Sequence, residues 1–251
     1  MNKELFEYCL RLGDSSLIMS QRLGEWCGHG PILEEDIALT NIALDLIGQA
    51  RAFLTYAGEV EGMGRSEDEL AYHRDAQQFR NVLLSEQPNG DFGVTIIRQL
   101  FVSTYQFYLY TELCKSKDQT LAALAAKSLK EVTYHVRHAS DWTLRLGDGT
   151  EESHERAQTA VDDLWIFIDD LFDKDEVDDT LLKQSIAPDI TEVRKQWMSH
   201  IQKVLSEATL TIPELNSFMR TGSRRGNHTE YLGYILAEMQ FLPRAYPDAK
   251  W

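Results

Sequence analysis

Residues Glu34–Glu59, EEDIALTNIALDLIGQARAFLTYAGE, are the stretch of sequence that decides the fold. They form one long helical pattern, and the acidic residues at positions 34–36 suit the positive end of a helix dipole. Apolar residues recur on every side of this helix, at Ile37, Leu39, Ile42, Leu44, Leu46, Ile47, Phe53 and Leu54. A helix that is apolar all round is covered by its neighbours, so this stretch predicts the centre of a helical bundle.

Helical patterns continue on both sides of this stretch. The chain is punctuated by breaks at Gly13–Ser15, Cys27–Pro31, Glu61–Glu69, Pro88–Gly90 and Gly147–Gly149. Between and after them we expect helices at residues 5–12, 16–26, 70–84, 92–115, 119–146, within 151–179, and at 191–208 and 229–246. Residues 210–227 are expected to be irregular. No alternating strand pattern competes, so we expect an all-α protein, a four-helix core with additional C-terminal helices, in a single domain over residues 1–251.

The segment 119–146 has the clearest inward face. Its small and apolar positions alternate at spacings of four and three residues, with one histidine among them: Leu121, Ala125, Ser128, Val132, His135, Ala139 and Trp142. The segment 92–115 is bulky and carries several aromatic residues. Both are therefore expected to be core helices.

Composition restricts the class of partner. The formal net charge is -15 at pH 7, which opposes binding to nucleic acid or to anionic lipid. The three cysteines, Cys9, Cys27 and Cys114, are far apart and predict reduced thiols rather than disulfides or a metal site. The N-terminal residues do not resemble a signal peptide, and no run is apolar enough to predict a membrane helix. We expect a cytoplasmic protein whose partners are proteins or a ligand in a local pocket.

A helical chain of this kind raises the question of a di-iron centre. The ferritin-like carboxylate site takes one Glu from each of two helices and Glu-x-x-His from each of the other two, because residues three apart share a helix face. The core helices lack that pattern. Where it would fall, Asp45 is followed three residues later by Gly48, and His135 is preceded three residues earlier by Val132, with Glu131 pointing elsewhere.

Several of these residues have more than one interpretation. For Asp45 the favoured one is a buried ion pair or polar network, ahead of a small-molecule contact and a metal ligand. His135 is expected to be a hydrogen-bonded core histidine, and Gly48 is either tolerated or allows a neighbouring helix to approach closely. Glu131, Arg137 and His138 are expected on the flank or surface. The basic segment Arg220–Gly226 is either an anion site or a docking loop.

Separated blocks of sequence resemble a known family, the C subunits of the phenylacetyl-CoA epoxidase complex. The blocks cover nearly the whole chain: Ser20–His29, Leu44–Arg51, Glu86–Gly90, Arg220–Gly222, His228–Glu230 and Ala237–Gln240. The resemblance implies a ferritin-like subunit of a bacterial multicomponent monooxygenase in aerobic phenylacetate catabolism. It implies a subunit that supports a related di-iron catalytic subunit without carrying iron or catalytic residues of its own.

The resemblance also supplies partners and aligned positions. The implied partners are the di-iron catalytic epoxidase subunit, a small bridging subunit and a flavin and iron–sulfur reductase of the same NADPH- and O2-dependent complex. A homodimer of the isolated chain is left open. Set beside the catalytic subunit's ligands, the degenerate positions are Asp45, Gly48, Ser103, Val132 and His135. The equivalent position on the first core helix is not fixed.

Two other functions compete with a structural role. The chain would be a metal-binding oxygenase subunit in its own right if Asp45, His135 and Glu131 formed an atypical site. A weaker alternative is that a pocket left by the lost metal binds part of a ligand.

Overall fold

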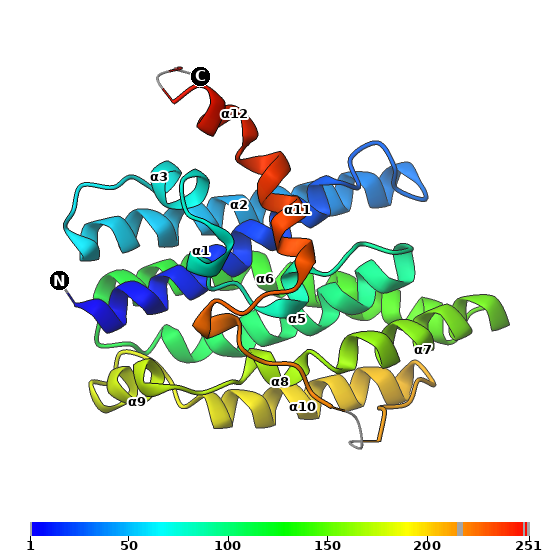
Figure 1. Ribbon diagram of the computed structural model, residues 1–251. Helices are drawn as coiled ribbons and strands as arrows, with labels where there is room; N and C mark the ends of the chain where they lie inside the picture. The colour runs from blue at the N-terminus through cyan, green and yellow to red at the C-terminus, as the bar shows by residue number, and fades with distance from the viewer. Residues whose placement is uncertain (1, 215–217, 248, 250–251) are drawn as a thin grey trace. The chain divides into compact units, whose positions relative to one another are not determined.

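The computed structural model describes residues 2–214, 218–247 and 249, and every regular element among them is helical (Figure 1). The prediction of an all-α protein is therefore confirmed, and the four longest helices form two hairpins, as a ferritin-like bundle requires. The chain divides into two compact units: unit 1 comprises Met1–Pro88 and Gly222–Trp251, and unit 2 comprises Asn89–Thr221. The single domain expected from the sequence stays a prediction.

Unit 1 is built on the hairpin of α1 (Lys3–Gly24) and α2 (Leu33–Glu61), which pack against each other. The side chain of Asn2 caps α1 by accepting a hydrogen bond from the Leu5 amide at 3.1 Å. α2 ends at Gly62, where φ is 71°. The other elements are short: α3 (Glu67–Tyr72), η1 (Ala76–Gln78), α4 (Leu83–Glu86), η2 (Ser223–Arg225), α11 (Glu230–Met239) and α12 (Phe241–Ala245).

The predicted break at Gly13–Ser15 is wrong, because α1 runs through it as one helix. Gly13 is there for packing: a Cβ at this position would lie 2.8 Å from the Leu54 side chain of α2. Asp14 is fully buried and obtains its hydrogen bonds from distant parts of the chain. Two residues that favour helix ends, glycine after the last turn and aspartate before the first, are thus held inside one helix by tertiary contacts.

The predicted length of α2 is nearly right, but its predicted burial on all sides is wrong. One face, including Leu39, Ile42 and Leu46, is buried, whereas Ile37 and Leu44 are exposed. By length and composition alone, α2 is also long and apolar enough to cross a membrane. One such helix is weak support for a membrane protein, since core helices of soluble proteins share these features.

The predicted helix at 70–84 is also wrong, because the chain forms α3, η1 and α4 with non-helical backbone between them. Backbone groups in this segment form hydrogen bonds with the buried charged side chains of Asp14 and Arg74 instead of helical hydrogen bonds. The Arg80 amide donates to Asp14 Oδ2 at 2.8 Å, and the Gln78 carbonyl accepts from Arg74 Nη1 at 2.9 Å. Local helical periodicity cannot show such distant partners.

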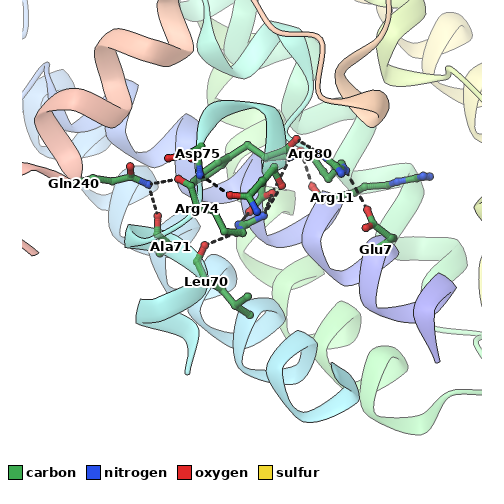
Figure 2. A network of polar contacts seen from close by, with 12 residues as sticks. Glu7, Arg11, Leu70, Ala71, Arg74, Asp75, Arg80 and Gln240 are labelled. Atoms are coloured by element: carbon green, nitrogen blue, oxygen red, sulfur yellow. Dashed lines mark hydrogen bonds and ion pairs between the residues drawn. The ribbon is translucent and has the colours of Figure 1, made fainter. Parts of the chain in front are cut away.

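Arg74 and Asp14 form the buried ion pair at the centre of this network, with 3% and 0% of their surfaces exposed. Arg74 Nη1 donates to Asp14 Oδ2 at 2.9 Å, and Arg74 Nη2 donates to the other carboxylate oxygen. Figure 2 shows Arg80 continuing the network to Glu7, whose Oε2 accepts from Arg80 Nε at 3.0 Å. The pair therefore fastens α1 to the segment between α3 and α4.

The same network holds the end of the chain. The Gln240 amide donates to the carbonyls of Ala71 and Arg74 at 3.0 and 2.9 Å (Figure 2). Gln240 is also the residue at which α11 ends and α12 begins, so the predicted helix at 229–246 is interrupted there.

Unit 2 is organised around α5 (Phe92–Leu113), which packs on α6 (Gln119–Gly147), α7 (Glu151–Trp165) and α10 (Ile190–Glu207). The predicted core helices at 92–115 and 119–146 and the predicted helix at 191–208 are confirmed. Trp197 of α10 packs against Phe101 and donates from its indole nitrogen to the Phe101 carbonyl at 2.9 Å. The predicted helix within 151–179 is divided, with α8 (Ile168–Leu171) and α9 (Glu176–Lys183) following α7. All positions of the α6 stripe are buried except Trp142, which packs edge-on against Phe92.

The Asp14 pair generates a test of unit 1. We expect Asp14→Ala to lower the free energy of unfolding by about 3–5 kcal/mol, because it leaves the Arg74 charge buried without its carboxylate. Chemical denaturation of the purified chain measures this. The control is Asp75→Ala, which removes an exposed partner of Arg244 and should lower the free energy by less than about 1 kcal/mol. Equal effects of the two substitutions would contradict the assignment of the central role to Asp14.

Candidate functional site

The five degenerate ligand positions are divided between the two units. Asp45 and Gly48 lie on α2 of unit 1, where Asp45 is half-buried and Gly48 is exposed. Ser103 on α5 and Val132 and His135 on α6 lie in unit 2, and all three are fully buried. α5 and α6 pack against each other, so unit 2 contains three of these positions in its core.

The side chains at these positions are poor ligands for a pair of iron ions. Val132 and Gly48 offer no donor atom, and the Ser103 hydroxyl donates a hydrogen bond to the Gln99 carbonyl at 2.6 Å. Within residues 2–214, 218–247 and 249, no three His, Cys, Asp or Glu side chains gather closely enough to hold a metal ion. A carboxylate-bridged centre requires several converging carboxylates and imidazoles. The donor set does not fit that group.

The structure revises the roles expected of the neighbouring residues. His135 is buried as predicted, and Arg137 is exposed as predicted. The prediction for His138 is wrong: it is 9% exposed, because it follows His135 by three residues and shares its side of α6. The close approach considered for Gly48 is not made within the described part of the chain, where no atom lies within 4 Å of the position its Cβ would take.

One Glu-x-x-His spacing does occur outside the core helices, at Glu151 and His154 of α7. Glu151 is exposed, and His154 is half-buried with Nδ1 2.7 Å from the Gly147 carbonyl oxygen. Both residues lie in the first turn of α7, where His154 also contacts the Thr209 hydroxyl at 3.3 Å. The spacing therefore belongs to a helix-end contact rather than to a metal ligand set.

A row of buried polar side chains on α5 was not predicted from the sequence. It consists of Thr95, Arg98, Gln99, Ser103, Thr104 and Gln106, each less than 9% exposed. The Gln99 amide has no hydrogen-bond partner among the described residues. Such a group carries a desolvation cost of about 1–3 kcal/mol. The one feature of the sequence that could have indicated these buried polar side chains is the large number of polar residues in an otherwise aromatic and apolar helix.

A part-buried tyrosine–histidine pair joins α5 to α10. The Tyr108 hydroxyl lies 3.1 Å from His200 Nδ1. Burial raises the pKa of Tyr108, and burial together with the Lys203 charge lowers the pKa of His200. His200 is therefore neutral near pH 7, and the pair serves as an uncharged interhelical contact.

The most complete polar centre surrounds the buried carboxylate of Glu86 in unit 1. Its Oε1 accepts from the Thr229 amide at 2.6 Å and from the Thr229 hydroxyl at 2.8 Å. Its Oε2 accepts from Asn81 Nδ2 at 2.9 Å and lies 2.9 Å from His228 Nδ1. Both oxygens of the Glu86 carboxylate therefore have hydrogen-bond partners from other segments of unit 1.

The contacts of His228 determine its charge. While Nδ1 faces the Glu86 carboxylate, Nε2 lies 3.0 Å from the Phe79 carbonyl oxygen. Both facing oxygens are acceptors, so a ring that carries a proton on each nitrogen satisfies both contacts, and in that form His228 makes an ion pair with Glu86. Arg22 of α1 adds two hydrogen bonds to the Glu86 carbonyl, at 3.2 and 2.8 Å. We call Arg22, Asn81, Glu86, His228 and Thr229 the Glu86 cluster.

The Glu86 cluster gives a physical meaning to the separated sequence blocks. Arg22, Glu86 and His228 come from three of the blocks that carry the family resemblance, and Gln240 in a fourth block ties α11 to the Asp14 network. Residues of these blocks therefore hold α1, α4 and the C-terminal segment together.

The basic segment at the start of the C-terminal part is docked rather than open. Ser223 and Arg224 are buried, and a Cβ at Gly226 would lie 2.2 Å from the Gln77 carbonyl oxygen. For residues 222–226, which belong to unit 1, this burial favours the docking loop over the anion site.

Comparison with known proteins agrees with the resemblance. A family model described as "Phenylacetic acid catabolic protein" matches residues 1–251. The C subunit of the 1,2-phenylacetyl-CoA epoxidase of Escherichia coli (strain K12) is 50% identical over 248 residues, which is 99% of this chain and 99% of the relative.

The Glu86 cluster predicts how the C-terminal segment is held. We expect Glu86→Ala to lower the free energy of unfolding by about 3–5 kcal/mol and to speed amide hydrogen exchange in residues 222–247, because it leaves the His228 charge without its carboxylate. The control, Glu230→Ala, removes an exposed carboxylate from the first turn of α11 and should cost less than about 1 kcal/mol. Unchanged amide exchange of residues 222–247 in Glu86→Ala would show that the Glu86 cluster does not hold the C-terminal segment.

Replacing Gln99 is expected to change the free energy of unfolding in the opposite direction. We expect Gln99→Met to leave the free energy of unfolding unchanged or to raise it by up to about 1–3 kcal/mol, since the amide lacks partners among the described residues. Gln240→Met is the matched control and should lower it, because that amide donates two hydrogen bonds. A large loss of stability in Gln99→Met would show that the amide has a partner of its own.

Proposed function

Because the chain belongs to the phenylacetic acid catabolic protein family, we propose that it is a structural, non-catalytic subunit of a phenylacetyl-CoA epoxidase complex. In this role it pairs with a di-iron catalytic subunit and supports it in aerobic phenylacetate catabolism. The identity of 50% over nearly the full length of the E. coli C subunit supports this assignment.

The observation that carries the non-catalytic part of the proposal is the chemistry of the degenerate positions. Val132 and Gly48 cannot bind a metal, and the Ser103 hydroxyl is engaged with a backbone carbonyl. The polar clusters of unit 1 hold their carboxylates in ion pairs with Arg74 and His228. Di-iron chemistry, which activates oxygen, is therefore assigned to the catalytic partner.

The proposal includes the remaining members of the complex. A small bridging subunit and a flavin and iron–sulfur reductase would complete the NADPH- and O2-dependent epoxidase. The chain's own contribution is a rigid helical frame, fastened by the Asp14 and Glu86 ion pairs. A cytoplasmic location is part of the same proposal, and the net charge of -15 argues against nucleic acid as a partner.

The atypical metal site remains the competing function. In the part of the chain that the structure describes, no group of three His, Cys, Asp or Glu side chains that could hold a metal ion includes Asp45, Glu131 or His135. The structural role therefore accounts for more of the observations.

Reconstitution of the epoxidase tests the proposal. We expect phenylacetyl-CoA turnover by the catalytic subunit and reductase to be lost or strongly reduced when this chain is omitted, and to return when it is added. The variants Asp45→Asn, Ser103→Ala and Glu131→Gln should each restore turnover within about twofold of the wild-type chain, because none of them supplies a catalytic group.

Two results would contradict the proposal. Full turnover without this chain would remove its supporting role. A loss of kcat in one of the three variants, with the amount of assembled complex unchanged, would point to a reacting centre in this chain.

A further inference from the structure

An asparagine followed by a glycine, Asn89–Gly90, lies just before α5 at the start of unit 2. The fold requires the glycine, because φ of Gly90 is 57° and a Cβ there would lie 2.9 Å from Cγ2 of Val94. Glycine is also the residue that least hinders attack by its backbone nitrogen on the preceding asparagine side chain, since it has no Cβ. The turn therefore keeps a chemically labile pair of residues in place.

The backbone nitrogen of Gly90 is available as a nucleophile. Gly90 is exposed, and its N–H makes no hydrogen bond within residues 2–214, 218–247 and 249. The carbonyl of the same peptide unit, that of Asn89, accepts a hydrogen bond from the Thr95 hydroxyl at 2.9 Å. This bond draws electron density towards the carbonyl oxygen and so makes the Gly90 N–H more acidic. Loss of that proton is the step that makes the nitrogen reactive.

The side-chain amide of Asn89 is polarised by a second donor. Its Oδ1 accepts a hydrogen bond from Nη2 of Arg98, whose side chain is fully buried. When a nucleophile adds to Cγ of Asn89, negative charge develops on Oδ1, and a guanidinium donor at this position stabilises that charge. Thr95 and Arg98 therefore act on the two groups that would react with each other.

From these contacts we propose that Asn89–Gly90 is a site of spontaneous deamidation, in which Thr95 and Arg98 assist ring closure. The Gly90 nitrogen gives its proton to water and bonds to Cγ of Asn89. The bond between Cγ and Nδ2 then breaks, and the amide group takes up a proton and leaves as ammonia, which closes a succinimide ring. Water opens the ring at either carbonyl and leaves aspartate or isoaspartate at position 89. The net reaction consumes water and releases ammonia, without oxidation or reduction.

The two products change the turn in different ways. Aspartate at position 89 keeps the backbone unchanged and offers Arg98 a carboxylate, so the hydrogen bond becomes an ion pair. Isoaspartate adds a methylene group to the main chain, which displaces the carbonyl that Thr95 binds. Deamidation therefore changes charge and backbone just before α5 as the protein ages, independently of the proposed function.

Peptide mapping by mass spectrometry tests the proposal on the purified full-length chain. During incubation in mildly alkaline buffer, we expect Asn89 to lose its amide with first-order kinetics, and isoaspartyl methyltransferase to label part of the product. Asn41 and Asn81 are internal controls that should stay intact, because β-branched residues follow them and hinder the attack. If Asn89 keeps its amide after a synthetic peptide of residues 86–93 has fully converted, the proposal is overturned.

Two variants test the assistance and the product. Thr95→Val removes the hydroxyl, so Asn89 should lose its amide severalfold more slowly; an equal or faster loss would show that these contacts do not assist ring closure. Asn89→Asp should unfold at a denaturant midpoint at least as high as the wild-type chain, and Asn41→Asp, at an exposed site of α2, should leave the midpoint nearly unchanged. A marked fall for Asn89→Asp alone would show that Arg98 does not accept the product. Circular dichroism verifies that each variant is folded.

Discussion

A carboxylate that is removed from water must find donors within the protein, and this constraint shapes unit 1. Asp14 satisfies it with Arg74 and the Arg80 amide, and Glu86 satisfies it with His228, Thr229 and Asn81. These contacts join segments that are far apart in the sequence: α1, the connection between α3 and α4, and the C-terminal helices. The short elements of unit 1 also bury apolar side chains, such as Leu70, Leu84 and Leu232, and the buried ion pairs add specific contacts between them.

The same constraint explains why a ferritin-like chain can lack ferritin-like chemistry. Carboxylates that are already paired with arginine or histidine are not available to bridge metal ions, and in the core of unit 2 Val132 has no donor atom and the Ser103 hydroxyl is engaged with a backbone carbonyl. Family-typical residues, including Arg22, Glu86 and His228, instead hold segments of unit 1 together. This arrangement supports the proposed role, in which the chain supplies a defined shape to a catalytic relative.

The long helices of unit 2 could be predicted from the sequence, because α5, α6 and α10 have strong periodicity and clear caps. That Gly48 and Val132 carry no donor atom also follows from residue type alone, whereas their assignment as former ligand positions stays a prediction. The continuity of α1 through Gly13 and Asp14 could not be predicted, because it depends on Leu54 and Arg74 far along the chain. The helical pattern at residues 70–84 gave a wrong prediction, because backbone groups there bind Asp14 and Arg74 instead. The predicted burial of α2 on all sides was also wrong, because apolar residues such as Leu44 lie on its exposed face.

The central claim is that this chain contributes structure and no metal chemistry. The most direct measurement is the iron content of the purified chain after anaerobic loading with Fe(II) and removal of free metal. The account predicts iron far below one ion per chain and no spectroscopic signature of a coupled iron pair. A tightly bound pair of irons in every chain would contradict it.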